Sequence, residues 1–283
     1  MKLALKLLVL TLALFVLQSL DYAGLGLSET LRTAPLPALL AAFLSAAALA
    51  FAIRRARPDG VRLALAVFLV YYGTAYFLVA VEAVYLTDLL SPGLALRIFV
   101  NGAITAALFS PLAVWALGRW SAAQGDPGPD RLDPGPTLAP LAVLLRLGLA
   151  GAAWVILFVL VGALVFQPVA IALDPDAARA YLAAFAGVDP GRVLGLQFAR
   201  GAVWALLALP LLRRLRGPLS RVGLALAVLF AGLMAANLLI PAGLPVSIQL
   251  AHLAEVALEN FAFGWVVAAL FWTRKRFTPE SRE

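Results

Sequence analysis

The segment Ser247–Thr273, SIQLAHLAEVALENFAFGWVVAALFWT, decides how this chain folds. It is long and apolar enough to cross a lipid bilayer as a helix, yet it contains His252, Glu255, Glu259 and Asn260. At about 100° per residue these polar side chains fall within an arc of about 140°, so the rest of the helix surface is apolar. Polar groups inside a membrane span are costly, and they usually face the interior of a helix bundle. The segment therefore predicts a membrane-spanning bundle with a polar interior beside this helix.

The composition of the whole chain supports a membrane location. Hydrophobic residues make up 63% of the 283 residues and charged residues 13%, and the mean hydropathy is +0.96. Soluble domains contain about 45–50% apolar and about 25% charged residues, so this chain exceeds what one aqueous core can bury. Its apolar blocks are about 20 residues long, without the alternation typical of a membrane β-barrel. We therefore expect an all-α, polytopic transmembrane helical bundle.

The apolar blocks predict about eight helices with both termini in the cytoplasm. Residues 1–20 have the composition of a signal peptide, but no small-residue cleavage motif follows, so an uncleaved first helix is favoured. The other seven spans are expected near residues 34–53, 62–87, 95–117, 146–172, 194–212, 222–240 and 247–273.

The distribution of basic residues agrees with this count of helices. With the N-terminus inside, the cytoplasmic segments hold every Lys and Arg residue except Arg32, Arg97, Arg179, Arg192 and Arg200. The formal net charge of +7 is therefore explained by membrane topology, and we expect no nucleic-acid partner. The chain contains no cysteine, which excludes disulfides and thiolate metal sites.

A loop rich in proline and glycine divides the chain. DPGPDRLDPGP, residues 126–136, favours an extended linker, which we place at 121–140 within one integrated membrane domain. The flanking regions 1–120 and 141–283 would each hold four helices.

Two different alignments indicate an internal four-plus-four repeat. RRARPDGVRLALAV, from Arg54, resembles RRLRGPLSRVGLALAV, from Arg213, with a two-residue gap. A rival register pairs IFVNGAITAALFSPLAVWALG, from Ile98, with QFARGAVWALLALPLLRRLRG, from Gln197. The two registers disagree, so the sequence leaves the repeat open.

Residues 174–187, DPDAARAYLAAFAG, predict a short helix on the outer membrane surface. Asp174 fits the N-cap position, and Ala178, Tyr181 and Leu182 share one face. Interfacial packing or a partial lid would each suit such a helix.

Nearly all strongly polar side chains within the predicted spans fall in the outer half of the membrane. A helical rise of about 1.5 Å per residue places most of them within about 12 Å of the outer surface and Glu259 and Asn260 near the midplane. We therefore expect one outward-facing pocket above an apolar plug, lined by Glu82, Arg97, Asn101, Gln197, Arg200, His252, Glu255, Glu259 and Asn260. Because an unpaired charge in hydrocarbon costs several kcal/mol, Arg200 should pair with Glu255 or Glu82.

Three functions fit such a pocket. The first is binding or transport of a small polar solute or ion, with Glu259 as the group whose protonation couples to transport. In the second, the ion pairs hold the helices of a structural or assembly protein together. The third is an intramembrane metal-dependent enzyme that uses His252, Glu255 and Glu259. No other catalytic or cofactor-binding motif is found, so the sequence favours a non-enzymatic protein without a cofactor and leaves its oligomeric state open.

The pattern P-x-x-x-Q-L-A-H-L-A-E-x-x-x-E-N-F-A-F-G in the last span, with QFARGAVWALLALP upstream, resembles a group of bacterial multi-pass membrane proteins of unknown activity. The resemblance covers the second half of the chain. It implies the plasma (inner) membrane of a bacterium and no particular mechanism.

Overall fold

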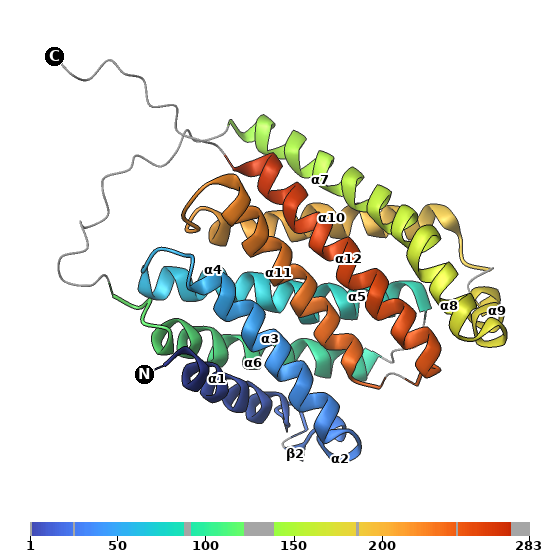
Figure 1. Ribbon diagram of the computed structural model, residues 1–283, viewed down its shortest axis with the longest axis horizontal. Coiled ribbons are helices and arrows are strands. Elements are labelled where there is room, and N and C mark those ends of the chain that lie inside the picture. The colour runs from blue at the N-terminus through green and yellow to red at the C-terminus, as the bar shows by residue number, and fades with distance from the viewer. Residues whose placement is uncertain are drawn as a thin grey trace.

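The protein is a bundle of long helices (Figure 1). The computed structural model describes residues 2–24, 26–87, 92–121, 139–184, 187–241 and 243–272. The principal helices are α1 (Leu3–Gln18), α3 (Pro35–Ile53), α4 (Gly60–Tyr72), α5 (Leu78–Thr87), α6 (Pro92–Ala116), α7 (Pro140–Val161), α8 (Gln167–Leu173), α10 (Pro190–Leu212), α11 (Leu219–Leu239) and α12 (Val246–Phe271). Two short helices, α2 (Glu29–Thr33) and α9 (Pro175–Ala184), and the two-residue strands β1 (Leu20–Asp21) and β2 (Gly26–Leu27) lie between them. The predicted all-α bundle is confirmed.

Seven helices in the described part of the chain are long and apolar enough to cross a membrane, which indicates a multi-pass integral membrane protein. The first apolar helix of the prediction, α1, has 16 residues and is shorter than the other spans. Its side chains Leu10 and Leu14 are fully buried against the bundle, so α1 is part of the packed core.

Two spans contain a π-helical turn that the sequence did not predict. The segment η1 (Gly73–Phe77) joins α4 to α5, and η2 (Gly162–Phe166) joins α7 to α8. A π-turn leaves a backbone carbonyl without its regular partner and is frequent at functional sites. In η1 the side-chain amide of Asn237 on α11 donates a hydrogen bond to the carbonyl of Ala75, at 3.0 Å. Asn237 thereby satisfies a carbonyl of the irregular turn.

One end of the bundle is rich in arginine. Helix α1 begins and α12 ends there, beside the loops that join α3 to α4 and α10 to α11 (Figure 1). Ala56 and Leu215 form an antiparallel backbone bridge between these two loops, flanked by hydrogen bonds of 2.8 and 3.0 Å. The Nε of Arg214 also donates to the Oδ2 of Asp59 at 2.9 Å. We refer to this as the arginine-rich end; the charge rule predicts that it faces the cytoplasm.

The helix contacts of the first half of the chain recur in the second half. Helix α1 packs on α3 and α6, and α7 packs in the same way on α10 and α12. Likewise α4 packs on α6 as α11 packs on α12. The two groups meet through α3 against α11 and through α4 against α10.

Burial follows the same repetition. The buried residues of α4 include Leu63, Ala66, Val67, Val70 and Tyr71. Ala56 and Leu215, which form the bridge, are 159 positions apart. The residues of α11 that follow the buried residues of α4 by 159 positions are also buried: Val222, Ala225, Leu226, Leu229 and Phe230. This spacing matches the start of the register at Arg54 and Arg213, whereas the LALAV segments of that register, which begin at Leu63 and Leu224, lie 161 positions apart because of its two-residue gap. The rival register, with a separation of 99 positions, does not match.

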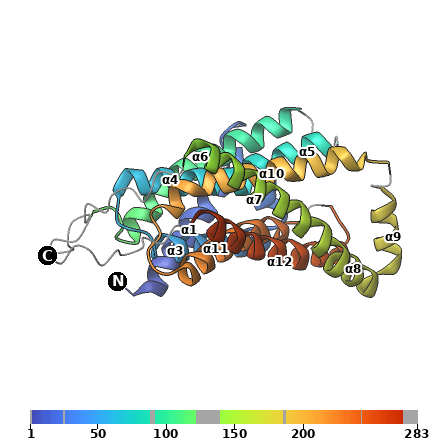
Figure 2. The ribbon, with the colours of Figure 1, turned by 90° about the horizontal axis from the view of Figure 1, so that it is seen from above.

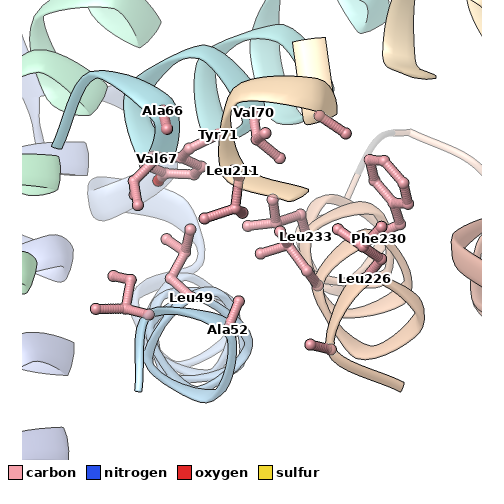
Figure 3. Close-up of a cluster of buried hydrophobic side chains, with 14 of the residues drawn as sticks. Leu49, Ala52, Ala66, Val67, Val70, Tyr71, Leu211, Leu226, Phe230 and Leu233 are labelled. Atoms are coloured by element: carbon pink, nitrogen blue, oxygen red, sulfur yellow. The ribbon is translucent and has the colours of Figure 1, made fainter. Parts of the chain in front are cut away.

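The hydrophobic core lies where the four inner helices meet (Figure 3). Figure 3 shows Leu49 of α3, Val67 and Tyr71 of α4, Leu211 of α10 and Phe230 of α11 in one cluster. All five side chains are at most 1% exposed. The core therefore joins the two groups of helices.

The opposite end of the bundle carries the β1–β2 hairpin and α9. Helix α9 runs across the bundle axis at this end (Figure 2), which confirms the short helix predicted between residues 174 and 187. The Oδ1 of Asp174 accepts a hydrogen bond from the backbone nitrogen of Ala177 at 3.0 Å, as an N-cap residue does. The predicted linker at 121–140 lies largely outside the described residues.

Candidate functional site

An ion pair joins the first and second groups of helices near the end opposite the arginine-rich one. The Nη1 of Arg200 on α10 lies 2.5 Å from the Oε2 of Glu82 on α5. Gln197, one turn earlier on α10, donates to the other oxygen of Glu82 at 2.9 Å. The indole of Trp154 on α7 in turn donates to the Oε1 of Gln197 at 2.9 Å. Of the two predicted partners of Arg200, the structure selects Glu82.

The guanidinium of Arg200 lies on an aromatic surface. Its Cζ is 4.4 Å from the ring centroid of Trp204 and 5.9 Å from that of Trp154. A desolvated guanidinium is stabilised by such ring faces as well as by its carboxylate. Arg200 is 7% exposed, and its Nε has no hydrogen-bond partner among the described residues.

A second polar group connects α9 with α12. The hydroxyl of Tyr181 lies 2.6 Å from the Nε2 of His252, and the Nδ1 of His252 lies 2.8 Å from the Oε2 of Glu255. Phe166, the last residue of η2, covers the imidazole with a centroid distance of 4.4 Å. At Gly162, the first residue of η2, a Cβ would come within 3.2 Å of the Oε1 of Glu255. The π-helical turn therefore shapes the space that holds His252 and Glu255.

Glu259 and Asn260 lie one turn deeper on α12. Glu259 is 5% exposed and its Oε2 has no hydrogen-bond partner in the described part of the chain. The charges of Glu255, Arg200 and Glu82 all act on this carboxyl. Asn260 is fully buried, and its Nδ2 donates to the carbonyl of Val256 while its Oδ1 has no partner among the same residues. Glu259 and Asn260 form the buried end of the polar region, which also contains Glu82, Arg200, His252 and Glu255.

Aromatic rings close the bundle beneath Glu259. Trp154 contacts Trp204 and Phe263 edge-on, with centroid distances of 4.7 and 5.0 Å. Phe263 follows Glu259 by one helical turn and lies 5.8 Å from Phe230. All four rings are at most 1% exposed.

Arg97 and Asn101 belong to a different cluster, which corrects the expectation that they share a pocket with Glu82 and Arg200. The Nδ2 of Asn101 donates to the Oδ1 of Asp21 at 2.9 Å, and the Nη1 of Arg97 lies 3.7 Å from the Oδ2 of Asp21. The hydrogen bond from Asn101 is the main factor that lowers the pKa of the Asp21 carboxyl. Asp21 follows the first predicted helix in the sequence, and the β1–β2 hairpin brings it to α6.

Other polar partners at this end also escaped the sequence analysis. Tyr181 was placed on the apolar face of its helix without a polar partner. The side-chain amide of Gln18 donates to the hydroxyls of Tyr71 and Tyr76, at 3.2 and 3.0 Å. Tyrosine and tryptophan match the apolar pattern of a span, so their hydrogen bonds leave no mark in hydropathy.

The residues considered for a metal site are not arranged around a common point. No group of three His, Asp or Glu side chains in the described residues could hold a metal ion. The two ring nitrogens of His252 already face Tyr181 and Glu255. The structure therefore gives no support to the metal-dependent enzyme.

Searches of protein-family models, of curated proteins and of solved structures found no match for this chain. The resemblance to bacterial multi-pass membrane proteins consequently stays a prediction.

Proposed function

We propose that the protein binds a small polar solute or ion at the Glu82–Arg200 and His252–Glu259 region and transports it across the membrane. Charged and amide side chains of α5, α10 and α12 converge there, although the surroundings are apolar. Ionisable groups inside membrane spans commonly mark the path of a substrate.

The observation that carries this proposal is a comparison within the molecule. If the chain consists of two repeats, the position equivalent to Arg200 is Ala41 on α3, 159 residues earlier. Aligning the buried rings Phe109 of α6 and Phe263 of α12 makes Thr105 the equivalent of Glu259. At these two positions the first repeat has a small and a neutral side chain, Ala41 and Thr105. The corresponding helix contacts therefore form without a charge there, which supports a functional role for Arg200 and Glu259.

The arrangement of the helices fits transport. Two parallel repeats about an axis along the membrane normal are one established transporter design, in which the repeats tilt around a site between them. Here the Glu82–Arg200 pair joins the two groups at one end, and the Ala56–Leu215 bridge joins them at the other. The aromatic layer beneath Glu259 closes the site toward the arginine-rich end. We take this as an outward-facing arrangement in the plasma membrane of a bacterium.

A thermal-stability screen of the purified protein tests the proposal. The panel contains amino acids, short dicarboxylates, polyamines, and sodium and ammonium salts. A ligand at about 100 times its dissociation constant stabilises the native state by about 2.7 kcal/mol, so a binding solute raises the melting temperature. The shift should disappear in Glu259→Gln and Arg200→Gln.

Asp176→Asn is the matched control, because Asp176 lies on exposed α9 and pairs with Arg179. It should respond to the solute as the unaltered protein does. A screen without any stabilising solute, or a shift that both site variants retain, would leave the ion pairs with the structural role alone.

A further inference from the structure

We propose that Tyr181, His252, Glu255 and Glu259 form a path that carries protons from the outer surface to the middle of the bundle. This inference rests on the proposed transport function, because the proton would be an ion that the same site binds and transports. It assigns a role to α9, whose tyrosine supplies the entrance.

The first three members are already connected by hydrogen bonds. The Tyr181 hydroxyl lies 2.6 Å from the Nε2 of His252, and the Nδ1 of His252 lies 2.8 Å from Glu255. An imidazole with a partner at each nitrogen can accept a proton on one side and release another on the opposite side. The His252 side chain is 22% exposed and that of Glu255 8%, so the path leads inward.

Glu259 is the receiving group at the buried end. It follows Glu255 by four residues on α12, so the two carboxyl groups are neighbours on one helix face. Its Oε2 is buried and has no hydrogen-bond partner in the described chain. The aromatic rings of Trp154, Trp204 and Phe263 lie beyond it, so a proton that reaches Glu259 stops there in this conformation.

The proton balance of the path is simple. Tyr181 gives its hydroxyl proton to the Nε2 of His252 and takes another from a hydronium ion outside, which becomes water. His252 passes its Nδ1 proton to Glu255, and Glu255 protonates Glu259. Burial, with the charges of Glu255 and Glu82, raises the pKa of the Tyr181 phenol, so the phenol stays protonated by taking up a new proton as it passes its own to His252.

Among the described residues, few charged side chains surround the path. Among the helices packed on α12, α10 contributes Arg200, whose charge opposes those of the carboxylates, and α9 contributes Tyr181. Glu82 of α5 acts on both Glu259 and Tyr181. The other charged residues of the packed helices have partners or positions away from the path. Arg146 donates to the carbonyl of Leu270 at the arginine-rich end, and Arg192, near the start of α10, donates to the carbonyl of Tyr85. Arg221 lies in the first turn of α11, and Asp176 pairs with Arg179 on the surface of α9.

Time-resolved infrared spectroscopy of the full-length protein tests the path. A rapid step from alkaline to mildly acidic solution should produce a carbonyl band of a protonated, buried carboxyl group, and that band should be missing in Glu259→Gln. Its appearance should slow by about 100-fold in His252→Gln, the lower end of what a positioned proton-transfer group contributes. Tyr181→Phe should slow it less, because water can reach the part-exposed His252 directly.

Asp176→Asn, on the same helix as Tyr181, should leave the rate unchanged. Tyr181→Phe removes only a hydroxyl, so it keeps the test valid if a substitution on α12 prevents folding. A band that survives in Glu259→Gln, no band in the unaltered protein, or rates that neither His252→Gln nor Tyr181→Phe alters would overturn the path. The solute screen and the infrared experiment distinguish the two proposals. If a solute binds but no proton is delivered to Glu259, only the proton path is excluded. If a proton is delivered but no solute binds, only the proposed solute site is excluded.

Discussion

At the scale of single residues, the Glu82–Arg200 pair makes the clearest energetic prediction. The Arg200 side chain is 8% exposed and that of Glu82 29%, so removing either charge leaves the other poorly solvated. Glu82→Gln should destabilise the protein by about 1–3 kcal/mol, less than for a fully buried pair because Glu82 is partly exposed. Thermal unfolding in detergent measures this loss.

The double variant Glu82→Gln/Arg200→Gln supplies the control. Because it removes both charges, it should be more stable than the sum of the two single changes predicts. Additive effects would show that the two side chains do not interact energetically.

We expect the stability of the protein to depend on pH through Asp21, which contacts Arg97 and Asn101. The hydrogen bond from Asn101 lowers its folded-state pKa below the ordinary value of 3.8. Its contribution to stability is therefore complete above that value and is lost as the pH falls through the lower folded-state pKa. Asp21→Asn should flatten the acid side of a plot of melting temperature against pH. An unchanged acid slope would mean that the Asp21–Asn101 contact does not persist in solution.

At the scale of helices, glycine determines how closely α11 and α12 approach. A Cβ at Gly264 would overlap the backbone of α11 at Ala227, which cannot rotate away as a side chain can. Gly264→Ala should therefore cost about 3 kcal/mol, the upper end for an overpacked contact.

Gly148→Ala provides the comparison, since an added Cβ at Gly148 on α7 meets nothing within 4 Å. That change should be neutral or slightly stabilising, because alanine is the better helix former. Equal melting temperatures for the two variants would contradict the close contact.

The elements could be predicted well from the sequence, whereas the partners within the site could not. Runs of apolar residues bounded by arginine, proline and glycine define the spans, and their structural bounds differ from the prediction by a few residues in most cases. The π-helical turns at Gly73 and Gly162 leave no such pattern, because they change the local hydrogen bonds and not the hydropathy.

Which polar side chains pair with each other depends on the direction of each helix and on its rotation about its own axis. Arg200 and Glu82 are both deep and oppositely charged, so their pairing was among the predicted alternatives. Arg97 was predicted to lie nearer the rim of the same pocket, but the β1–β2 hairpin gives it Asp21 as its partner. The depth of a residue in the membrane can be calculated from its position along the helix. The neighbour that its side chain faces is known only from the tertiary structure.

At the scale of the whole molecule, the bridge between Ala56 and Leu215 offers a way to hold the two groups of helices together. Residues paired in an antiparallel bridge have Cα atoms about 4.5–5.5 Å apart, within the range of about 4.4–6.8 Å for a disulfide. Ala56→Cys/Leu215→Cys should therefore form a disulfide on oxidation, and the natural chain has no cysteine to compete. Mass spectrometry without reductant detects the bond.

The consequence of this disulfide separates binding from transport. If the two groups tilt against each other, the oxidised variant should still bind its solute and should fail to transport it until it is reduced. Ala56→Cys alone is the control and should be active in both conditions. Transport that continues with the disulfide in place would exclude an opening movement at this end.

The central claim is that the polar region of α12 is reached by water from the side opposite the arginine-rich end. The most direct measurement is the reaction of single cysteines with a charged, membrane-impermeant thiol reagent added to the outside of intact cells. Glu255→Cys should react, whereas Leu258→Cys, on the same helix with a side chain exposed toward lipid, should not. An unreactive Glu255→Cys, or reaction only when the reagent reaches the cytoplasmic side, would contradict an outward-facing polar site.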